Sequence, residues 1–328
     1  MNWLRATLGE LAAPDVAAGD AVRARAADIL RPAGALARLD AVAAWVAEWQ
    51  GTATPAVRRP AALIFAADHG VAAAGVSNYP ADVTGAMLAA YRAGKSTVSA
   101  FAAAAGATVD AIDVGVGRPT GDIRVEPALS EERFAECVRA GREAVDALDA
   151  DLLVIGEMGI GNTTAAAAVT AALLGGDATE WVGRGTGVDD DGLGRKQDAV
   201  IAATQRIAAI TDPLEVLRQV GGAELVAMAA AVVAARQRKL PVLLDGYVVT
   251  SAVLPLHVVE PTALAHCQVG HCSAEPGHRR LLRALGRQPL LDLEMRLGEG
   301  SGAMAAVPLV RMACAGVTDV PTFAEWFG

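Results

Sequence analysis

The sequence predicts an α/β fold, a Rossmann-like parallel sheet flanked by helices, and three observations support this class. Short apolar segments alternate with long stretches in which apolar residues recur at helical spacing, a pattern typical of strands joined by crossover helices. Polar or glycine-rich residues directly follow several of the apolar segments, as at the carboxyl ends of parallel strands. Finally, the 328-residue chain is 53% hydrophobic, which is enough to cover a sheet on both faces.

The amino-terminal part of the chain is predicted to be helical. Apolar residues recur at helical spacing over 20–30 and 36–49, and the run Arg31-Pro32-Ala33-Gly34 breaks the pattern between them. We expect residues 1–60 and roughly 300–328 to form a small helical domain. Residues 61–299 are expected to form a large α/β domain that carries the active site.

Five apolar segments of the large domain are predicted strands. They cover 61–67, 108–114, 151–155, 241–244 and 289–293. The main helices predicted between them cover 83–105, 164–174, 195–210 and 223–238. Three of the strands run directly into polar or glycine-rich residues: Asp68-His69-Gly70, the stretch 156–164, and Asp245-Gly246-Tyr247. Because parallel strands end at the same edge of a sheet, these residues predict one composite ligand site.

Composition excludes several classes of protein. A formal charge of −9 lacks the basic footprint of a nucleic-acid-binding surface. Alanine is the most abundant residue while aromatic residues are only 4%, which favours closely packed helices over a bulky core. No signal peptide is visible, and the uncharged stretch 158–176 is too polar at its start for a membrane span. We therefore expect a cytoplasmic protein with four reduced cysteines and no membrane partner.

The stretch 156–164 is the most informative segment. A predicted strand enters a loop containing Gly159 and Gly161, and Asn162-Thr163-Thr164 then opens an alanine-rich helix. Glycines let the backbone approach an anion, and free N–H groups at a helix start bind phosphate. The loop lacks the Gly-Lys-Ser/Thr ending of a P-loop, so a single phosphate fits better than a diphosphate with magnesium. The alternative is a threonine-capped helix after a tight turn.

A second polar loop, residues 184–196, ends in one of only three lysines, Lys196. This lysine is a candidate to neutralise a phosphate, or it is an ordinary surface lysine. The run Asp189-Asp190-Asp191 in the same loop offers hard oxygens for a divalent metal, but such runs more often form a solvated turn with one aspartate capping a helix.

Four of the five histidines lie between His257 and His278, near two cysteines. The pairs His266-Cys267 and His271-Cys272 suggest zinc, yet their spacing matches none of the usual ligand patterns. We expect no metal here, and we expect Ser273 in the polar loop that follows to offer its hydroxyl to a phosphate.

Glu299 stands among glycines in Leu297-Gly298-Glu299-Gly300-Ser301-Gly302, at the start of an apolar helix. A carboxylate held in a largely apolar pocket has a raised pKa, which suits a general base near neutral pH. The alternative is a helix-start glutamate favoured by the helix dipole. Glu157, at the end of a predicted strand, is a second candidate carboxylate.

Several of these motifs occur together, in one order along the chain. They are Ala67-Asp68-His69-Gly70-Val71 with Gly75-Val76-Ser77, the stretch 156–164, Gly183-Arg184-Gly185-Thr186-Gly187, Leu244-Asp245-Gly246, Ser273-Ala274-Glu275-Pro276-Gly277-His278, and Leu297-Gly298-Glu299-Gly300-Ser301-Gly302. Taken together, the chain resembles the nicotinate-nucleotide–dimethylbenzimidazole phosphoribosyltransferase family from about Arg31 almost to its C-terminus. The resemblance implies transfer of the phosphoribosyl group of nicotinate mononucleotide to 5,6-dimethylbenzimidazole, with inversion at C1′, for the lower ligand of cobalamin. It implies no cofactor, and a homodimer whose active site borrows residues from the neighbour.

The resemblance also implies a role for each candidate residue. Glu299 is the expected catalytic base. The expected phosphate and ribose pocket consists of Gly159, Gly161, Asn162, Thr163, Lys196, Ser273 and Gly302. The expected base pocket consists of Glu157, Ser77, Tyr79, Met87 and Leu297.

One stretch departs from the family pattern. Where the family often has a glutamine after Val83-Thr84, this chain has Gly85-Ala86-Met87. That glutamine helps to hold the aromatic base, so adenine, phenols or other benzimidazoles are alternative acceptors. A non-catalytic nucleotide-binding paralogue is a further alternative, although Glu299 in its glycine setting argues for catalysis.

Overall fold

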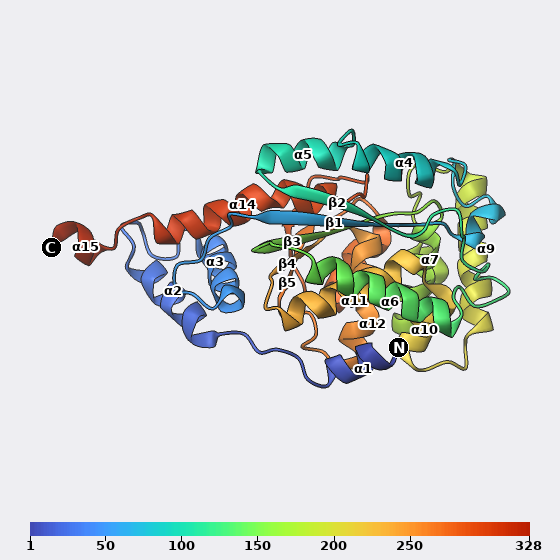
Figure 1. The fold of residues 1–328 in the computed structure, drawn as a ribbon, viewed down its shortest axis with the longest axis horizontal. Coiled ribbons are helices and arrows are strands. Elements are labelled where there is room, and N and C mark those ends of the chain that lie inside the picture. The colour runs from blue at the N-terminus through green and yellow to red at the C-terminus, as the bar shows by residue number, and fades with distance from the viewer.

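The computed structural model describes residues 1–328 and contains one six-stranded parallel sheet between two layers of helices (Figure 1). The strand order is β2-β1-β3-β4-β5-β6. The strands are β1 (Pro60–Ala67), β2 (Thr108–Gly115), β3 (Leu152–Met158), β4 (Val242–Leu244), β5 (Cys267–His271) and β6 (Pro289–Leu291). The predicted Rossmann-like α/β class is confirmed.

The central strands bury both of their faces. Along β1, Leu63 and Phe65 belong to one hydrophobic core, while Ala62 and Ile64 belong to the core on the opposite face. Because both faces are covered, β1 is apolar throughout and shows no alternation with polar residues.

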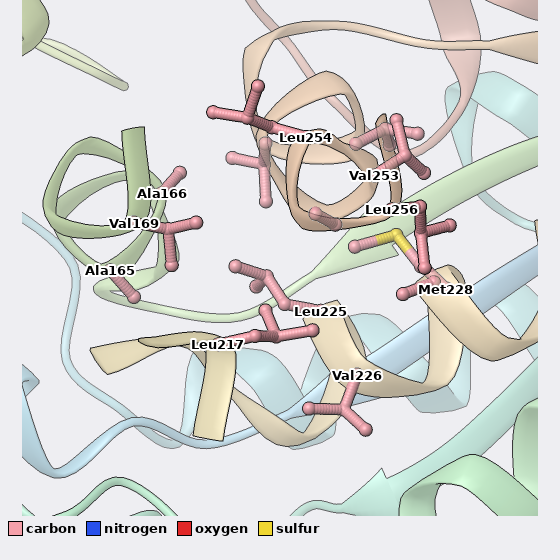
Figure 2. Close-up of a cluster of buried hydrophobic side chains, with 14 of the residues drawn as sticks. Ala165, Ala166, Val169, Leu217, Leu225, Val226, Met228, Val253, Leu254 and Leu256 are labelled. Carbon is pink, nitrogen blue, oxygen red and sulfur yellow. The ribbon is translucent and has the colours of Figure 1, made fainter. Parts of the chain in front are cut away.

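One layer is built from α6 (Glu131–Asp146), α7 (Asn162–Leu174), α9 (Asp190–Arg206), α10 (Pro213–Val220), α11 (Ala223–Gln237) and α12 (Tyr247–Val259). Figure 2 shows Val169 of α7, Leu217 of α10 and Leu225 of α11 directed into a shared interior, and Leu254 of α12 belongs to the same hydrophobic core. Alanine supplies much of the remaining contact, and its small side chain lets the helices approach closely. The alanine-rich composition therefore has its place in helix packing.

The other layer contains α2 (Val16–Asp28), α3 (Ala37–Gln50), α4 (Val83–Arg92), α5 (Thr97–Ala105) and α14 (Ser301–Thr318). Helix α14 packs against α3, α5 and β5. It is long and apolar enough to cross a membrane by composition alone, but 56% of it is buried inside the protein. It is accounted for as a core helix.

The remaining elements are short. They are α1 (Asn2–Leu8), the 3₁₀ helix η1 (Gly70–Ala74), α8 (Ala178–Trp181), α13 (Pro276–Ala284) and α15 (Phe323–Phe327). Helix α1 packs against α11, whereas α15 lies at the far end of the molecule beyond α14 (Figure 1). Arg25 of α2 pairs with Glu325 of α15 and so ties the two chain ends together.

Two sequence predictions about elements were wrong. Strand β5 was missed, because its histidine and cysteine content suggested a metal site although its residues are largely buried and pair with β4 and β6. The helix predicted over 83–105 is two helices: Gly94 takes a left-handed φ of 65° after α4, and Ser96 caps α5 by accepting from the Ser99 amide.

The sheet topology marks one place for a ligand. After β1 the chain crosses to β2 on one side, and it then returns to place β3 on the other side of β1. The connections after β1 and β3 therefore diverge and leave a crevice beyond the carboxyl ends of the strands. This topological switch point is where open α/β sheets bind ligands.

Candidate active site

The loops that follow β3, β4 and β5 line one cavity at the switch-point edge of the sheet. Its lining comprises Glu157, Met158, Gly159, Ile160, Asn162, Thr163, Gly185, Thr186, Gly246, Tyr247, Val248, His271, Ser273, Glu275, Arg296, Leu297 and Gly298. A second cavity shares Gly159, Asn162 and Thr163 and adds Ser77, Gly161 and Lys196. A larger cavity of about 540 Å³ lies elsewhere, between α1, α6 and α10. The residues suited to binding an anion line the two cavities at the strand ends and not this larger one.

The floor of the site is the loop between β3 and α7. Gly161 has φ 97°, a conformation that L side chains rarely adopt, and it immediately precedes the first residue of α7. The amide of Ile160 donates to Thr84 Oγ1 of α4 over 3.2 Å, which fixes the middle of the loop. The amino end of α7 therefore faces the cavity, where its dipole favours an anion.

Lys196 of α9 supplies a buried cation beside this loop. Its side chain is 1% exposed, and Nζ donates to Thr163 Oγ1 over 2.8 Å. Burial lowers the pKa of Lys196, and the nearby Glu275 partly offsets the effect. An ammonium group has three donors and only one is used, so this lysine is equipped to bind an anion.

Ser273, after β5, is oriented by a neutral histidine. Burial lowers the pKa of His278 to about 3. His278 Nδ1 accepts from the Ser273 amide over 2.9 Å and lies 3.0 Å from Ser273 Oγ, while Nε2 is 3.1 Å from Thr250 Oγ1. The Ser273 hydroxyl therefore sits at the cavity wall in a fixed position.

Glu299 adopts an unusual backbone conformation directly before α14. Its φ is 66°, and the flanking Gly298 and Gly300 have φ 84° and 79°. A non-glycine residue in the left-handed region is strained and is found preferentially at functional sites. Asp245, at the end of β4, stabilises this backbone conformation. Its carboxylate accepts hydrogen bonds from the amides of Gly300 over 3.2 Å and Ala303 over 2.8 Å.

The Glu299 carboxylate is buried and incompletely paired. Glu299 is 6% exposed, and its Oε2 atom has no hydrogen-bond partner. Burial raises the pKa of Glu299, an effect that the neighbouring Tyr91 hydroxyl and Val98 backbone partly offset. Tyr91 is also buried and its hydroxyl has no partner of good geometry. A carboxylate with a raised pKa and a free oxygen can accept a proton near neutral pH.

Glu157 is the second carboxylate of the cavity. Burial, followed by the negative charge of Asp245, raises the pKa of Glu157 to about 8. The Asn162 side chain donates to its Oε2. Glu157 is therefore a second carboxyl group of the cavity whose pKa is raised, and it accepts a hydrogen bond from Asn162.

The predicted base pocket is only partly assembled. Glu157 and Leu297 line the main cavity and Ser77 lines the adjoining one. Met87 of α4 packs at the edge of the hydrophobic core, while Tyr79 is 51% exposed, and neither residue lines these cavities. Asn78 donates to the Gly187 carbonyl over 2.6 Å, so the segment carrying Ser77 and Tyr79 is tied to the neighbouring loop.

Gly302 does not line either cavity. It lies in the first turn of α14, where its backbone contacts the His271 ring so closely that a side chain would not fit. His271 in turn lies 3.3 Å from Asp245 through Nε2. The other residues predicted for the phosphate and ribose pocket all line the cavities, whereas Gly302 contacts the ring of His271, which lines the main cavity.

The two histidine–cysteine pairs, His266-Cys267 and His271-Cys272, lie in different surroundings. His266 Nε2 is 2.9 Å from the Val232 carbonyl and its ring packs against Trp49, whereas His271 faces Asp245. Burial lowers the pKa of His266 to about 3.

The aspartate run Asp189-Asp190-Asp191 is engaged in local contacts. Asp189 caps α9 by accepting from the Gly192 amide over 2.8 Å, and Asp190 pairs with Arg184.

Three residues have roles in the structure that their sequence positions did not predict. Asp245 was visible as a polar residue after a strand, but its helix-capping role depends on the amides of Gly300 and Ala303, which are distant along the chain. Tyr91 gave no sequence signal. His69 stood in a recognised motif, but its buried partner Glu224 is equally distant in sequence.

Together the fold and site define an α/β enzyme with a pocket suited to an anion at the ends of its strands. Glu157 lines this pocket, whereas Glu299 lines neither cavity and directly follows the lining residue Gly298. The family model described as "Phosphoribosyltransferase" matches residues 11–326. The chain therefore belongs to this phosphoribosyltransferase family.

Curated relatives agree over nearly the whole chain. The nicotinate-nucleotide–dimethylbenzimidazole phosphoribosyltransferase of Mesorhizobium japonicum is 50% identical over 99% of this chain and 97% of its own length. The protein of the same name from Cereibacter sphaeroides is 48% identical over 98% of this chain and 95% of its own. The crystal structure of the enzyme so named from Thermus thermophilus matches with a TM-score of 0.89 and 41% identity, over 94% of this chain and 97% of that one.

Proposed function

We propose that this protein transfers the phosphoribosyl group of nicotinate mononucleotide to 5,6-dimethylbenzimidazole, forming α-ribazole 5′-phosphate and nicotinate for the lower ligand of cobalamin. The observation that carries the proposal is Glu299, held in a left-handed conformation with a free, buried carboxylate oxygen beside an anion pocket. The names of the relatives, which match along the whole chain, support the same reaction.

The anion pocket would bind the nucleotide by its phosphate. The amino end of α7, the free donors of Lys196 and the hydroxyl of Ser273 are the groups that a single phosphate requires. Gly159 and Gly161 let the backbone approach the phosphate closely. A monophosphate held in this way needs no diphosphate-binding metal, and we propose that the enzyme uses no cofactor.

The chemistry is a displacement at C1′ of the ribose. A ring nitrogen of the benzimidazole forms the new bond to C1′ from the face opposite the leaving group. The bond from C1′ to the pyridine nitrogen breaks, and its electron pair returns to nicotinate. Glu299 takes the N–H proton of the benzimidazole, so the nucleotide product is left without an extra ring proton. The protein contributes orientation and one proton acceptor.

Where the family often has a glutamine that helps to hold the base, this chain has Gly85-Ala86-Met87, so the second candidate function is the same transfer to another base. The test is incubation with nicotinate mononucleotide and an equimolar mixture of dimethylbenzimidazole, benzimidazole, adenine and a phenol, with the nucleotides identified by mass. Dimethylbenzimidazole product in excess supports the proposal, and a different dominant product replaces the acceptor. No product with any base would identify a non-catalytic paralogue.

We further propose that the enzyme is a cytoplasmic homodimer. Tyr79 and Leu297 lie 51% and 49% exposed at the side of the site where the base pocket is incomplete, which suits completion by a second copy. Light scattering should give about twice the 33.4 kDa mass of the chain. A monomer that retains full transfer activity would overturn this proposal.

A further inference from the structure

A buried polar pair lies directly beneath the loop that forms the anion pocket. His69, just after β1, places Nε2 2.5 Å from Oε1 of Glu224 in the first turn of α11. Both side chains are completely buried. Neither residue lines a cavity of the candidate site, so the pair has no place in the chemistry described above.

The pair fills the space under the loop. A Cβ atom added at Gly159 would lie 3.2 Å from Cδ2 of His69 and 3.1 Å from Oε1 of Glu224. On its other side, the His69 ring contacts the backbone of Gly222 too closely for any side chain there. Three chain segments, after β1, after β3 and before α11, therefore converge on these two side chains.

The two groups depend on each other for hydrogen bonding. The bond joins His69 Nε2 and Glu224 Oε1, and the remaining polar atoms, His69 Nδ1 and Glu224 Oε2, are buried without a hydrogen-bond partner. Apolar residues of similar volume would fill the space without the desolvation that this pair requires. The polar pair instead fixes the orientation of the His69 ring, because the short hydrogen bond to Glu224 sets the plane of the ring against which Gly159 packs.

We propose that His69 and Glu224 are positioning residues that hold the 159–161 loop where α7 and Lys196 bind the nucleotide phosphate. This inference rests on the proposed function for the identity of the nucleotide. The pair acts through the loop and touches neither substrate nor reacting atoms. Its effect should therefore fall on nicotinate mononucleotide and not on the acceptor base.

Steady-state kinetics of His69→Ala and His69→Gln test the proposal. His69→Ala should raise KM for nicotinate mononucleotide about tenfold or more, while KM for the base stays within about twofold. His69→Gln should restore the nucleotide KM to within about threefold of wild type, because its amide N–H reaches toward Glu224. Rescue by this substitution is not expected if the ring serves only as filler.

Two further variants separate positioning from folding. Because His69→Ala strands Glu224 without a partner, the double variant His69→Ala/Glu224→Ala is made alongside it and should show the same rise in nucleotide KM. His266→Ala is the matched control, since His266 is equally buried and also bonds through Nε2, to the Val232 carbonyl. It should lower Tm and leave both KM values unchanged.

Calorimetric titration with nicotinate mononucleotide distinguishes failure of this inference from failure of the proposed function. If wild type binds the nucleotide but transfers it to no base, the proposed function fails while weaker binding by His69→Ala still supports the pair's role. Wild-type nucleotide affinity in both His69→Ala and the double variant would overturn the inference. An equal rise in KM for both substrates, or the same rise in His266→Ala, would also overturn it.

Discussion

Glu299 is a buried residue with a strained backbone conformation and one carboxylate oxygen that has no hydrogen-bond partner. Replacement by glutamine keeps the size and removes the proton acceptor, so Glu299→Gln should lower kcat about 100-fold or more. KM for nicotinate mononucleotide should change little, because the phosphate pocket is intact. Kinetics on the folded variant, verified by circular dichroism, measure this. Glu294→Gln is the control, since Glu294 is an exposed residue of the same segment with a φ of 54°. Near-wild-type kcat in Glu299→Gln would remove Glu299 from the role of base.

The pH dependence follows from the same residue. Burial raises the pKa of Glu299, and a base acts only when deprotonated. In wild type, kcat should therefore fall as the pH drops through this raised pKa, above the ordinary glutamate range. In Glu299→Gln the same acid limb should be absent from the residual rate. An identical acid limb in both proteins would assign the titration to another group.

We expect Lys196 to favour nucleotide binding while lowering the free energy of unfolding. A buried ammonium group with one hydrogen bond is costly to fold, whereas methionine of similar length is not. Lys196→Met should therefore raise KM for nicotinate mononucleotide about tenfold or more and leave the free energy of unfolding equal or higher by about 1 kcal/mol. Kinetics and urea unfolding measure the two effects. Lys95→Met, at an exposed lysine between α4 and α5, should change neither quantity.

At the scale of elements, the start of α14 depends on a side chain from the end of β4. Asp245 accepts from two amides there, so Asp245→Ala should lower the free energy of unfolding by about 1 kcal/mol, as loss of a helix cap does. It should also lower kcat, because Glu299 directly precedes the freed turn. Ser130→Ala removes the cap of α6, outside the site, and should reduce stability without lowering kcat. Equal kcat in the two variants would show that Asp245 only stabilises the helix.

The sequence predicted those elements whose signal is local. Strands β1 and β3 were recognised because each is apolar and ends in residues suited to a ligand, and Glu299 stood out among glycines. Strand β5 was missed because its His and Cys side chains suggested chemistry, while the burial that makes it a strand comes from β4 and β6. Asp245 and the His69–Glu224 pair act through contacts between distant parts of the chain, and no local pattern encodes such a contact.

At the scale of the whole molecule, the reactivity of the four cysteine thiols can be used to measure global unfolding. All four are buried, and burial raises the pKa of Cys137, Cys267 and Cys314 to about 12. In native protein at neutral pH, thiol-specific reagents should react slowly, and the rate should rise with urea together with loss of circular dichroism. Rapid modification of one thiol before any unfolding would reveal a local opening instead.

The division into a small helical domain, residues 1–60 with roughly 300–328, and a large domain, residues 61–299, stays a prediction. Helix α3 packs against α14, as this division requires. Helix α14 also packs against β5, and α1 packs against α11, so both chain ends contact the sheet-containing part as well.

The packing of α3 on α14 also sets an order of events during synthesis. The ribosome makes α2 and α3 before any strand of the sheet, but their partner in the core, α14, follows all six strands. The apolar faces of α2 and α3 therefore lack this partner until α14 has been made. Since Glu299 lies at the beginning of that late helix, a chain interrupted before it has neither a closed core nor a proton acceptor. Completion of the core and acquisition of the proposed activity thus both depend on α14, which is translated after every strand of the sheet.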